Sequence, residues 1–135
     1  MAGVFEGGCL CGRVRYKIEG TPRDQVRCHC RMCQQSAGAP SLAWVTFARA
    51  DLQFTQDKPR YYRSSAEATR GFCGHCGTQL VFQLQAAPDE VDVTCASMDD
   101  PEHPDLVPKA HLWTESKIKW VALEKWPAHP RRRSS

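Results

Sequence analysis

Apolar and polar residues alternate strictly over residues 13–18, which is the pattern of a strand with one face in a core. Val14, Tyr16 and Ile18 fall on one side of such a strand, and the three residues interleaved with them are basic. Because successive side chains of a strand point to opposite faces, this period of two indicates one buried and one solvated face. A Gly-Thr-Pro turn sequence at residues 20–22 ends the predicted strand.

The same pattern recurs farther along the chain. Alternating or β-branched and aromatic stretches predict further strands at residues 42–47, 52–54, 80–84 and 91–95. No window of about 12 or more residues shows sustained helical periodicity, and only a short helical turn is expected, at residues 34–38. The sequence therefore predicts a mainly β fold.

The chain length fits one domain. A chain of 135 residues is large enough to bury one core but not two independent ones. The segment after Met98 is polar and rich in proline, and apolar stretches follow at residues 111–113 and 118–121. We expect a single domain over residues 1–127 and a disordered basic tail over residues 128–135.

Composition and charge exclude several classes of protein. The formal net charge is +3, and the three arginines at residues 131–133 account for all of it, so no basic face for nucleic acid is expected. No apolar run approaches the roughly 18 to 20 residues of a membrane span. The first residues also lack the charged and apolar regions of a secretory signal. We therefore expect a cytoplasmic protein with reduced thiols and with neither nucleic acid nor membrane as a partner.

Seven of the eight cysteines fall into three closely spaced groups, which in a reducing compartment are typical of metal ligands or catalytic thiols. Cys73 and Cys76, followed by Gly77, have the form of a zinc knuckle, whose backbone amides donate to the sulfurs. Cys9 and Cys11 also precede a predicted strand, so the two pairs can complete one tetrahedral structural zinc site. We call these four residues the four-cysteine cluster and expect it to link two adjacent strands. The alternative is a set of buried or redox-active thiols.

The remaining group is Cys28, Cys30 and Cys33, which we call the three-cysteine cluster. These residues are close enough in sequence to converge on one ion by themselves. Three protein ligands leave the fourth position of zinc open for water or for a substrate thiolate, which is typical of a catalytic site. The alternative is a second structural site completed by His29, His111 or another residue. Because His29 lies between two of the expected ligands in the sequence, its side chain is expected to point away from the metal.

The eighth cysteine, Cys95, has a different setting. It alternates with Val91 and Val93 in a predicted strand. A buried thiol in the core is expected there rather than a metal ligand.

Three motifs together resemble the glutathione-dependent formaldehyde-activating enzyme family, which also includes centromere protein V. They are the cysteine-bearing segments at residues 8–16, 28–38 and 72–78. Residues 98–101 and 111–117 are also similar to that family, so the resemblance covers nearly the whole chain. It implies a zinc-stapled domain of curved antiparallel sheets, similar to the Rab exchange-factor-like zinc proteins.

The resemblance also implies roles for the seven cysteines and two Zn²⁺ ions per chain. The residues matching the family's structural zinc ligands are Cys9, Cys11, Cys73 and Cys76. The residues matching its catalytic zinc ligands are Cys28, Cys30 and Cys33.

The activity implied by the family is that of a carbon–sulfur lyase of the S-(hydroxymethyl)glutathione synthase type, with glutathione or another small thiol as partner. His29, His75 and His111 are candidate general acids. Arg31 and Arg70 are candidate partners for the glutathione carboxylates, although a solvent-facing position is expected for each. The alternative function is a non-catalytic zinc module that binds a protein, as in centromere protein V. Nothing in the sequence indicates the oligomeric state.

Overall fold

The computed structural model describes residues 3–132 of the chain. Its strands form two sheets. The smaller sheet has the order β1 (Gly3–Gly8), β2 (Arg15–Gly20), β5 (Leu52–Phe54). The larger sheet has the order β10 (Ala110–Leu112), β3 (Asp24–Cys28), β4 (Leu42–Ala48), β9 (Glu90–Thr94), β8 (Gln79–Leu84), β7 (Ala68–Phe72), β6 (Arg60–Arg63). In addition there are the helix α1 (Arg31–Ala37) and short 3-10 turns at Arg49–Asp51, Cys95–Ser97, Pro104–Leu106 and Thr114–Ser116.

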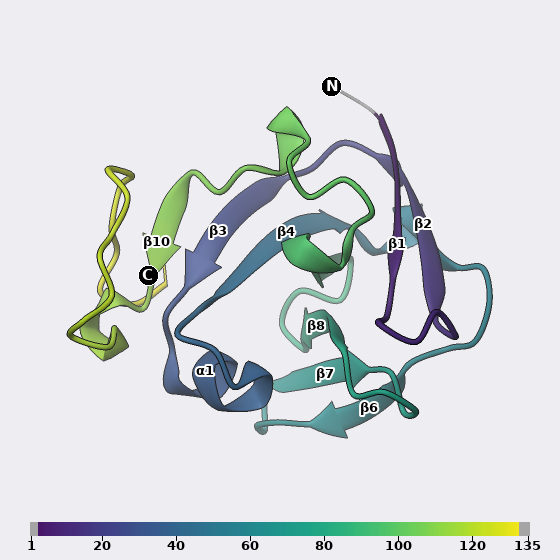
Figure 1. Ribbon diagram of the computed structural model, residues 1–135, viewed down its shortest axis with the longest axis horizontal. Helices are drawn as coiled ribbons and strands as arrows, with labels where there is room; N and C mark the ends of the chain where they lie inside the picture. Colours follow the sequence, from purple (N-terminus) through teal and green to yellow (C-terminus); the bar gives the residue numbers. More distant parts are fainter. Residues whose placement is uncertain (1–2, 133–135) are drawn as a thin grey trace.

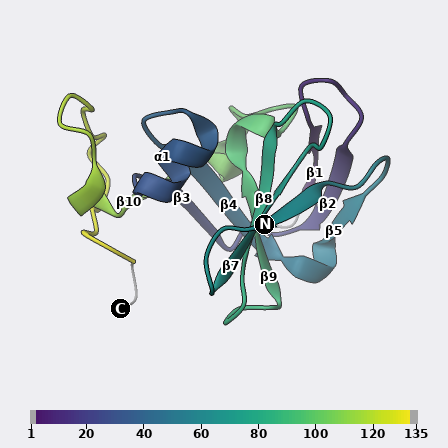
Figure 2. The same ribbon diagram turned by 90° about the horizontal axis from the view of Figure 1, so that it is seen from below.

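The two sheets give the molecule two unlike sides. β3 and β4 run as long curved strands across the middle, with β1 and β2 on one side (Figure 1). On the other side lie β10, which pairs with β3, and the C-terminal segment, and α1 lies beside β3 and β4 on that side, as the turned view also shows (Figure 2). The first side carries the four-cysteine cluster and the second the three-cysteine cluster.

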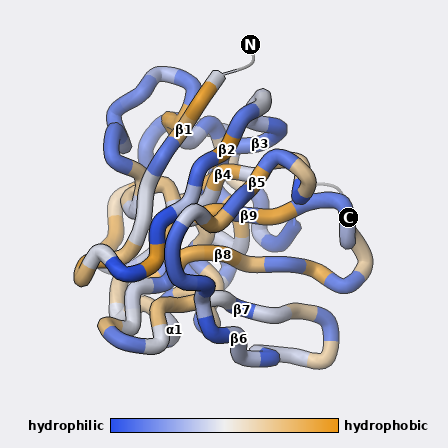
Figure 3. Tube along the Cα trace, turned by 90° about the vertical axis from the view of Figure 1, so that its right-hand side faces the viewer, coloured by the Kyte–Doolittle hydropathy of each residue, from blue (hydrophilic) through white to orange (hydrophobic). Residues whose placement is uncertain are grey.

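The larger core lies between the two sheets. Val14, Tyr16 and Ile18 are all buried, so the alternation read from the sequence is confirmed. They pack in one cluster with apolar residues of the larger sheet, among them Phe47 and Leu80. The apolar stretches of β8 and β9 run through the middle of the molecule, whereas the edge strand β6 is polar (Figure 3). Burial of these side chains is the main free-energy gain that holds the sheets face to face.

A second, smaller core lies beside α1. It contains Val26, Trp44 and Ala110 together with two of the cysteines of the three-cysteine cluster. Phe82 and Trp113 pack against it. Two thiols of that cluster are thus held in place by packing on the same side as the helix.

The mainly β fold is confirmed, with one correction to the sheet geometry. β10 pairs with β3 in parallel, from Ala110 opposite Val26 to Leu112 opposite Cys28, so the larger sheet is mixed rather than wholly antiparallel. The predicted helical turn is a seven-residue helix that begins at Arg31. The start of the helix was not predicted because its N-cap is Cys30 rather than the usual Ser, Thr, Asp or Asn. The Cys30 sulfur accepts a hydrogen bond from the backbone N–H of Cys33.

The first residues of the expected tail lie against β10. Ala128 forms a parallel bridge with His111, and the backbone N–H of His129 donates to the carbonyl of His111 at 2.9 Å. The backbone N–H of Trp113 likewise donates to the carbonyl of Arg131. A short edge strand has unpaired backbone groups, and this segment satisfies them. Residues 133–135 of the expected disordered tail lie outside the described residues, and the domain boundary at residue 127 stays a prediction.

Helices are short throughout the described part of the chain. The one α-helix there, α1, has seven residues, whereas a helix that crosses a membrane needs about 20. No helix of residues 3–132 therefore meets the requirement for a membrane span.

Candidate metal centres

The four-cysteine cluster is assembled from two turns that are more than 60 residues apart in the chain. The sulfurs of Cys9, Cys11, Cys73 and Cys76 all lie within 4.8 Å of one another. The Sγ atoms of Cys9 and Cys11 are 3.5 Å apart, and those of Cys11 and Cys73 are 3.8 Å apart. A tetrahedral zinc with bonds of about 2.3 Å to sulfur separates its ligands by about 3.8 Å, so the four thiols fit that ion.

Backbone amides orient the sulfurs of this cluster. The N–H groups of His75 and Cys76 both donate to the Sγ of Cys73 at 3.4 Å, and Val14 N–H donates to the Sγ of Cys9 at 3.2 Å. Gly77 has a φ of 84°, in the left-handed region that favours glycine. These are the donors and the turn expected of a zinc knuckle, and they favour thiolates over neutral thiols.

Thr78 adds a side-chain contact that the sequence did not point to. Its Oγ1 lies 3.3 Å from the Sγ of Cys76 and accepts the backbone N–H of Leu10 at 3.0 Å. Hydrogen bonds from Thr78 lower the pKa of Cys76 to about 5. The same hydroxyl therefore contacts both halves of the cluster.

The expected link between adjacent strands is wrong. Cys9 and Cys11 lie between β1 and β2 of the smaller sheet, whereas Cys73 and Cys76 lie between β7 and β8 of the larger one. The cluster consequently joins the two sheets at one end of the core between them. Sequence spacing showed that each pair precedes a strand but not that the strands belong to different sheets.

The three-cysteine cluster lies where β3 passes into α1. Cys28 is the last residue of β3, Cys30 caps α1 and Cys33 is in its first turn. Their three sulfurs lie within 4.8 Å of one another, and Cys28 and Cys33 are buried. The backbone N–H of Cys33 donates to the Sγ of Cys30 at 3.3 Å. A strand end and a helix cap thus bring the three thiols together over only six residues.

The protonation of these thiols is strongly linked. Contacts with the Cys28 and Cys33 side chains lower the pKa of Cys30 to about 2, whereas contacts with Cys30 and Cys33 raise the pKa of Cys28 far above its ordinary value. Three thiolates this close repel one another unless a cation lies among them. The donor set therefore fits a thiophilic divalent ion such as zinc.

No fourth ligand completes this cluster within the described chain. The group that shares the 4.8 Å spacing contains the three cysteines and no His, Asp, Glu or further Cys of residues 3–132. The histidines proposed for a closed site, His29 and His111, are not among its members. This geometry favours the open site over the closed alternative.

His29 and His111 instead form a buried pair. Both side chains are fully buried, and the Nε2 of His29 lies 3.0 Å from the Nδ1 of His111. Trp126 stacks on His111 with ring centroids 4.9 Å apart, and Glu124 contacts the Nε2 of that ring. Burial lowers the pKa of His29 to about 4. The third candidate acid, His75, is exposed beside the four-cysteine cluster.

Arg70 is not solvent-facing, contrary to the expectation from sequence. Only 5% of its surface is exposed. Its Nη2 donates to the Sγ of Cys33 at 3.7 Å and its Nη1 to the Oγ of Ser36 at 3.4 Å. The sequence placed Arg70 close to Cys73, three residues away, but β7 carries its side chain into the other cluster. Arg31 is exposed as expected and donates to Gln34.

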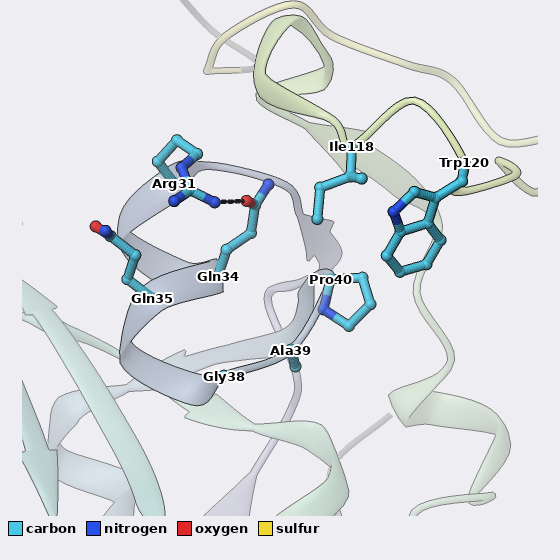
Figure 4. A pocket seen from close by; sticks show the side chains of 8 residues that line it. All are labelled: Arg31, Gln34, Gln35, Gly38, Ala39, Pro40, Ile118 and Trp120. Atoms are coloured by element: carbon cyan, nitrogen blue, oxygen red, sulfur yellow. Dashed lines mark hydrogen bonds between the residues drawn. The ribbon is translucent and has the colours of Figure 1, made fainter.

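A pocket of about 410 Å³ opens on the outer side of α1 (Figure 4). Arg31 and Gln34 line it from the helix, and Ile118 and Trp120 face them from the C-terminal segment. Its volume is within the usual range for a small-molecule site. None of the three thiols lines it, so it lies next to the three-cysteine cluster rather than over it.

Cys95 has the setting that the sequence predicted. Its side chain is buried, and its Sγ lies 3.6 Å from the carbonyl oxygen of Leu106. Burial raises the pKa of this thiol. It belongs to the larger core and to neither cluster.

The family model for the glutathione-dependent formaldehyde-activating enzyme matches residues 4–116, a stretch that includes both clusters. The chain belongs to this family. A protein of Halomonas elongata, whose name includes the words glutathione-dependent formaldehyde-activating enzyme, is 28% identical to the chain over 131 residues. The match covers 90% of this chain and 82% of that protein.

Two further matches are more limited. An uncharacterized lyase of Schizosaccharomyces pombe is 31% identical over 78 residues, which is 58% of this chain and 56% of that protein. A crystal structure of a Rhodobacter sphaeroides protein superposes with a TM-score of 0.58 at 21% identity, covering 91% of this chain and 98% of that one. At this identity the likeness shows the fold alone.

Proposed function

We propose that this family member is a zinc-dependent enzyme of the carbon–sulfur lyase type. It would act on an adduct of glutathione or another small thiol, in the manner of S-(hydroxymethyl)glutathione synthase. The observation that carries the proposal is the three-cysteine cluster, whose thiols fit one metal ion and have no fourth protein ligand among residues 3–132. Membership of the family supports the choice of thiol and reaction.

The two clusters would hold two zinc ions with different roles. The four-cysteine cluster would hold a structural ion in a closed tetrahedral site of a Rab exchange-factor-like zinc fold. The three-cysteine cluster would hold the catalytic ion, whose Lewis acidity favours a substrate sulfur as thiolate at the open position. Both sites need reduced thiols, which is consistent with a cytoplasmic protein.

The residues of the chain would orient the reacting sulfur and stabilise the charge of the ligands. The backbone N–H of Cys33 and the guanidinium of Arg70 donate to cluster sulfurs, so the thiolates stay ionised and fixed in direction. In the synthetic direction the substrate thiol gives up its proton, the C–S bond forms as the carbonyl π bond breaks, and the aldehyde oxygen takes up a proton. The reverse direction breaks the same C–S bond.

The pocket beside α1 is the proposed place for the rest of the thiol substrate. Glutathione has two carboxylates, and Arg31 at the pocket wall provides an exposed guanidinium for one of them. Trp120 provides an apolar wall opposite. A tripeptide that reaches from this pocket toward Cys30 would place its sulfur next to the cluster.

The test is a rate measurement on three proteins: wild type, Cys30→Ser and, as a matched control, Cys95→Ala. Exchange NMR measures how fast formaldehyde and glutathione interconvert with their adduct, and zinc analysis and a glutathione titration accompany it. We expect Cys30→Ser to lose one of two zinc ions, glutathione binding and the rate enhancement, and Cys95→Ala to keep all three. A wild-type protein that holds two zinc ions but neither binds glutathione nor speeds exchange would support the protein-binding module instead.

A further inference from the structure

We propose that Arg70 is the counter-cation of the three-cysteine cluster, and that its charge is what lets this cluster accept an anionic sulfur as a fourth ligand. The second half of this inference rests on the proposed function, and the first half stands without it. The proposal assigns to Arg70 a positioning and charge-balancing role toward the ligands, in place of direct contact with a substrate carboxylate.

The setting of Arg70 is unusual for an arginine. Its side chain is 95% buried, between a helix and two strands of the larger sheet. The Cζ atom lies 4.9 Å from the centroid of the Phe82 ring and 5.9 Å from that of the Trp44 ring. Those rings attract the cation through their electron-rich faces, but they neutralise none of its charge.

No carboxylate balances this cation within residues 3–132, where no ion pair of Arg70 with Asp or Glu is found. Its Nε is buried and has no hydrogen-bond partner. A buried charge without a partner is strongly destabilising. The polar groups that the guanidinium does reach are Ser36 Oγ and Cys33 Sγ, and of these only the sulfur can carry a negative charge at neutral pH.

The charge count then explains why a cation lies here. Three thiolates around one divalent ion carry a net charge of −1, and Arg70 brings the assembly to zero. If the fourth ligand is itself a thiolate, the net charge of the assembly is −1 with Arg70 and −2 without it. In a buried site of low effective dielectric this difference strongly affects ligand binding. An anionic fourth ligand is therefore bound more favourably when Arg70 is present than at three thiolates and a metal ion alone.

A substrate carboxylate is the rival partner for Arg70, but the geometry is against it. The lining of the pocket beside α1 includes Arg31 and does not include Arg70. Both terminal nitrogens of Arg70 already donate to groups of α1. A carboxylate held in that pocket would contact Arg31 and not the buried guanidinium.

The experiment uses the cobalt-substituted protein, because thiolate ligands to Co²⁺ give charge-transfer bands whose intensity reports their number. Arg70→Met removes the charge and keeps much of the volume, and Arg70→Lys restores a charge. Arg63→Met, on the neighbouring strand β6, is the matched control, because Arg63 is exposed and donates to the carbonyl of Ala66 rather than to a sulfur. Occupancy of the four-cysteine cluster in each variant reports that the fold is intact.

Two quantities are measured for each variant. The first is the Co²⁺ affinity of the three-cysteine cluster by chelator competition. We expect Arg70→Met to lower it about 10- to 100-fold, the usual effect of losing a group that hydrogen-bonds to a metal ligand, with partial recovery in Arg70→Lys and no change in Arg63→Met. An unchanged affinity in Arg70→Met would overturn the counter-cation role.

The second quantity is the binding of two thiols. Glutathione has carboxylates, whereas 2-mercaptoethanol has none. We expect Arg70→Met to weaken both by a similar factor. Loss of glutathione binding alone would overturn the proposal and assign Arg70 to a substrate carboxylate. If neither thiol adds a charge-transfer band in wild type, the proposed function fails and with it the role toward a fourth sulfur, while the affinity measurement still decides the counter-cation role.

Discussion

The two cysteine clusters are made from the same ligand type but differ in how the chain builds them. The four-cysteine cluster joins turns from two different sheets. The three-cysteine cluster is local, spans six residues, and lies between a strand and a helix that the backbone already connects. A long-range cluster restricts the unfolded chain and so contributes to stability, whereas a local one contributes little and is free to serve chemistry.

Removing one cysteine from each cluster tests whether the two clusters contribute differently to stability. We expect Cys73→Ser to cost a large part of the free energy of unfolding, several kcal/mol out of the about 5 to 15 kcal/mol typical of a domain. Cys30→Ser should cost less, about 2 kcal/mol, because the backbone still connects α1 with β3 and the loss comes mainly from the weakened counter-charge of buried Arg70. Thermal unfolding followed by circular dichroism gives both values. Equal losses would show that the two clusters do not divide stability and chemistry between them.

A second prediction concerns the side of the molecule that carries the three-cysteine cluster. Truncation after Pro127 removes four backbone hydrogen bonds that residues 129–131 make with residues 111–115. With each such bond worth about 1 kcal/mol, we expect a loss of about 4 kcal/mol. Urea denaturation measures it, and truncation after Arg132 is the control. A truncated protein as stable as the full chain would show that the contacts along β10 contribute nothing.

A third prediction separates the clusters by their side-chain donors. Thr78→Val removes the hydroxyl beside Cys76, so the metal affinity of the four-cysteine cluster should fall by about tenfold, while that of the three-cysteine cluster stays the same. Chelator competition resolves the two release steps. Thr55→Val, at an exposed position, is the control, and an equal fall at both clusters would contradict the assignment.

The smallest expected effect tests the fold away from both clusters. Burial raises the pKa of Asp92 in β9 to about 6 from 3.8, so the folded state binds a proton that the unfolded state releases. The resulting stability is fully present below about pH 4 and is lost as pH rises through about 6. Asp92→Asn should therefore stabilise the fold at pH 8 by about 1 kcal/mol. Denaturation at pH 4 and pH 8 measures this, with exposed Asp57→Asn as the control; a stability no greater than wild type at pH 8 would contradict it.

The sequence predicted those parts of the molecule that depend on a regular spacing of one kind of residue. The alternation of Val14, Tyr16 and Ile18 predicted a buried face, and the spacing of seven cysteines predicted two clusters. Strands β1 and β6 were missed because they lack such a pattern. All four residues of β6 are exposed, so it has no buried apolar face. In β1 one buried position is Gly7, which has no apolar side chain because an added Cβ would lie 2.4 Å from the hydroxyl of Tyr16.

Long-range arrangement was the part that sequence did not show. Arg70 is three residues from Cys73 but contacts Cys33, because the direction of a side chain from a strand depends on register and on what packs over that face. The parallel pairing of β10 with β3 and the contacts of residues 128–131 with β10 likewise depend on parts of the chain that are distant in sequence. Local spacing indicated the candidate metal ligands, whereas the groups that contact them depend on tertiary packing.

Zinc X-ray absorption spectroscopy of the wild-type protein distinguishes one closed and one open metal centre from two closed centres. We expect a mean of 3.5 sulfur ligands per zinc, the average of four and three cysteines, rising to 4 when glutathione is added. A mean of 4 before addition, or a mean that stays at 3.5 in saturating glutathione, would contradict this expectation.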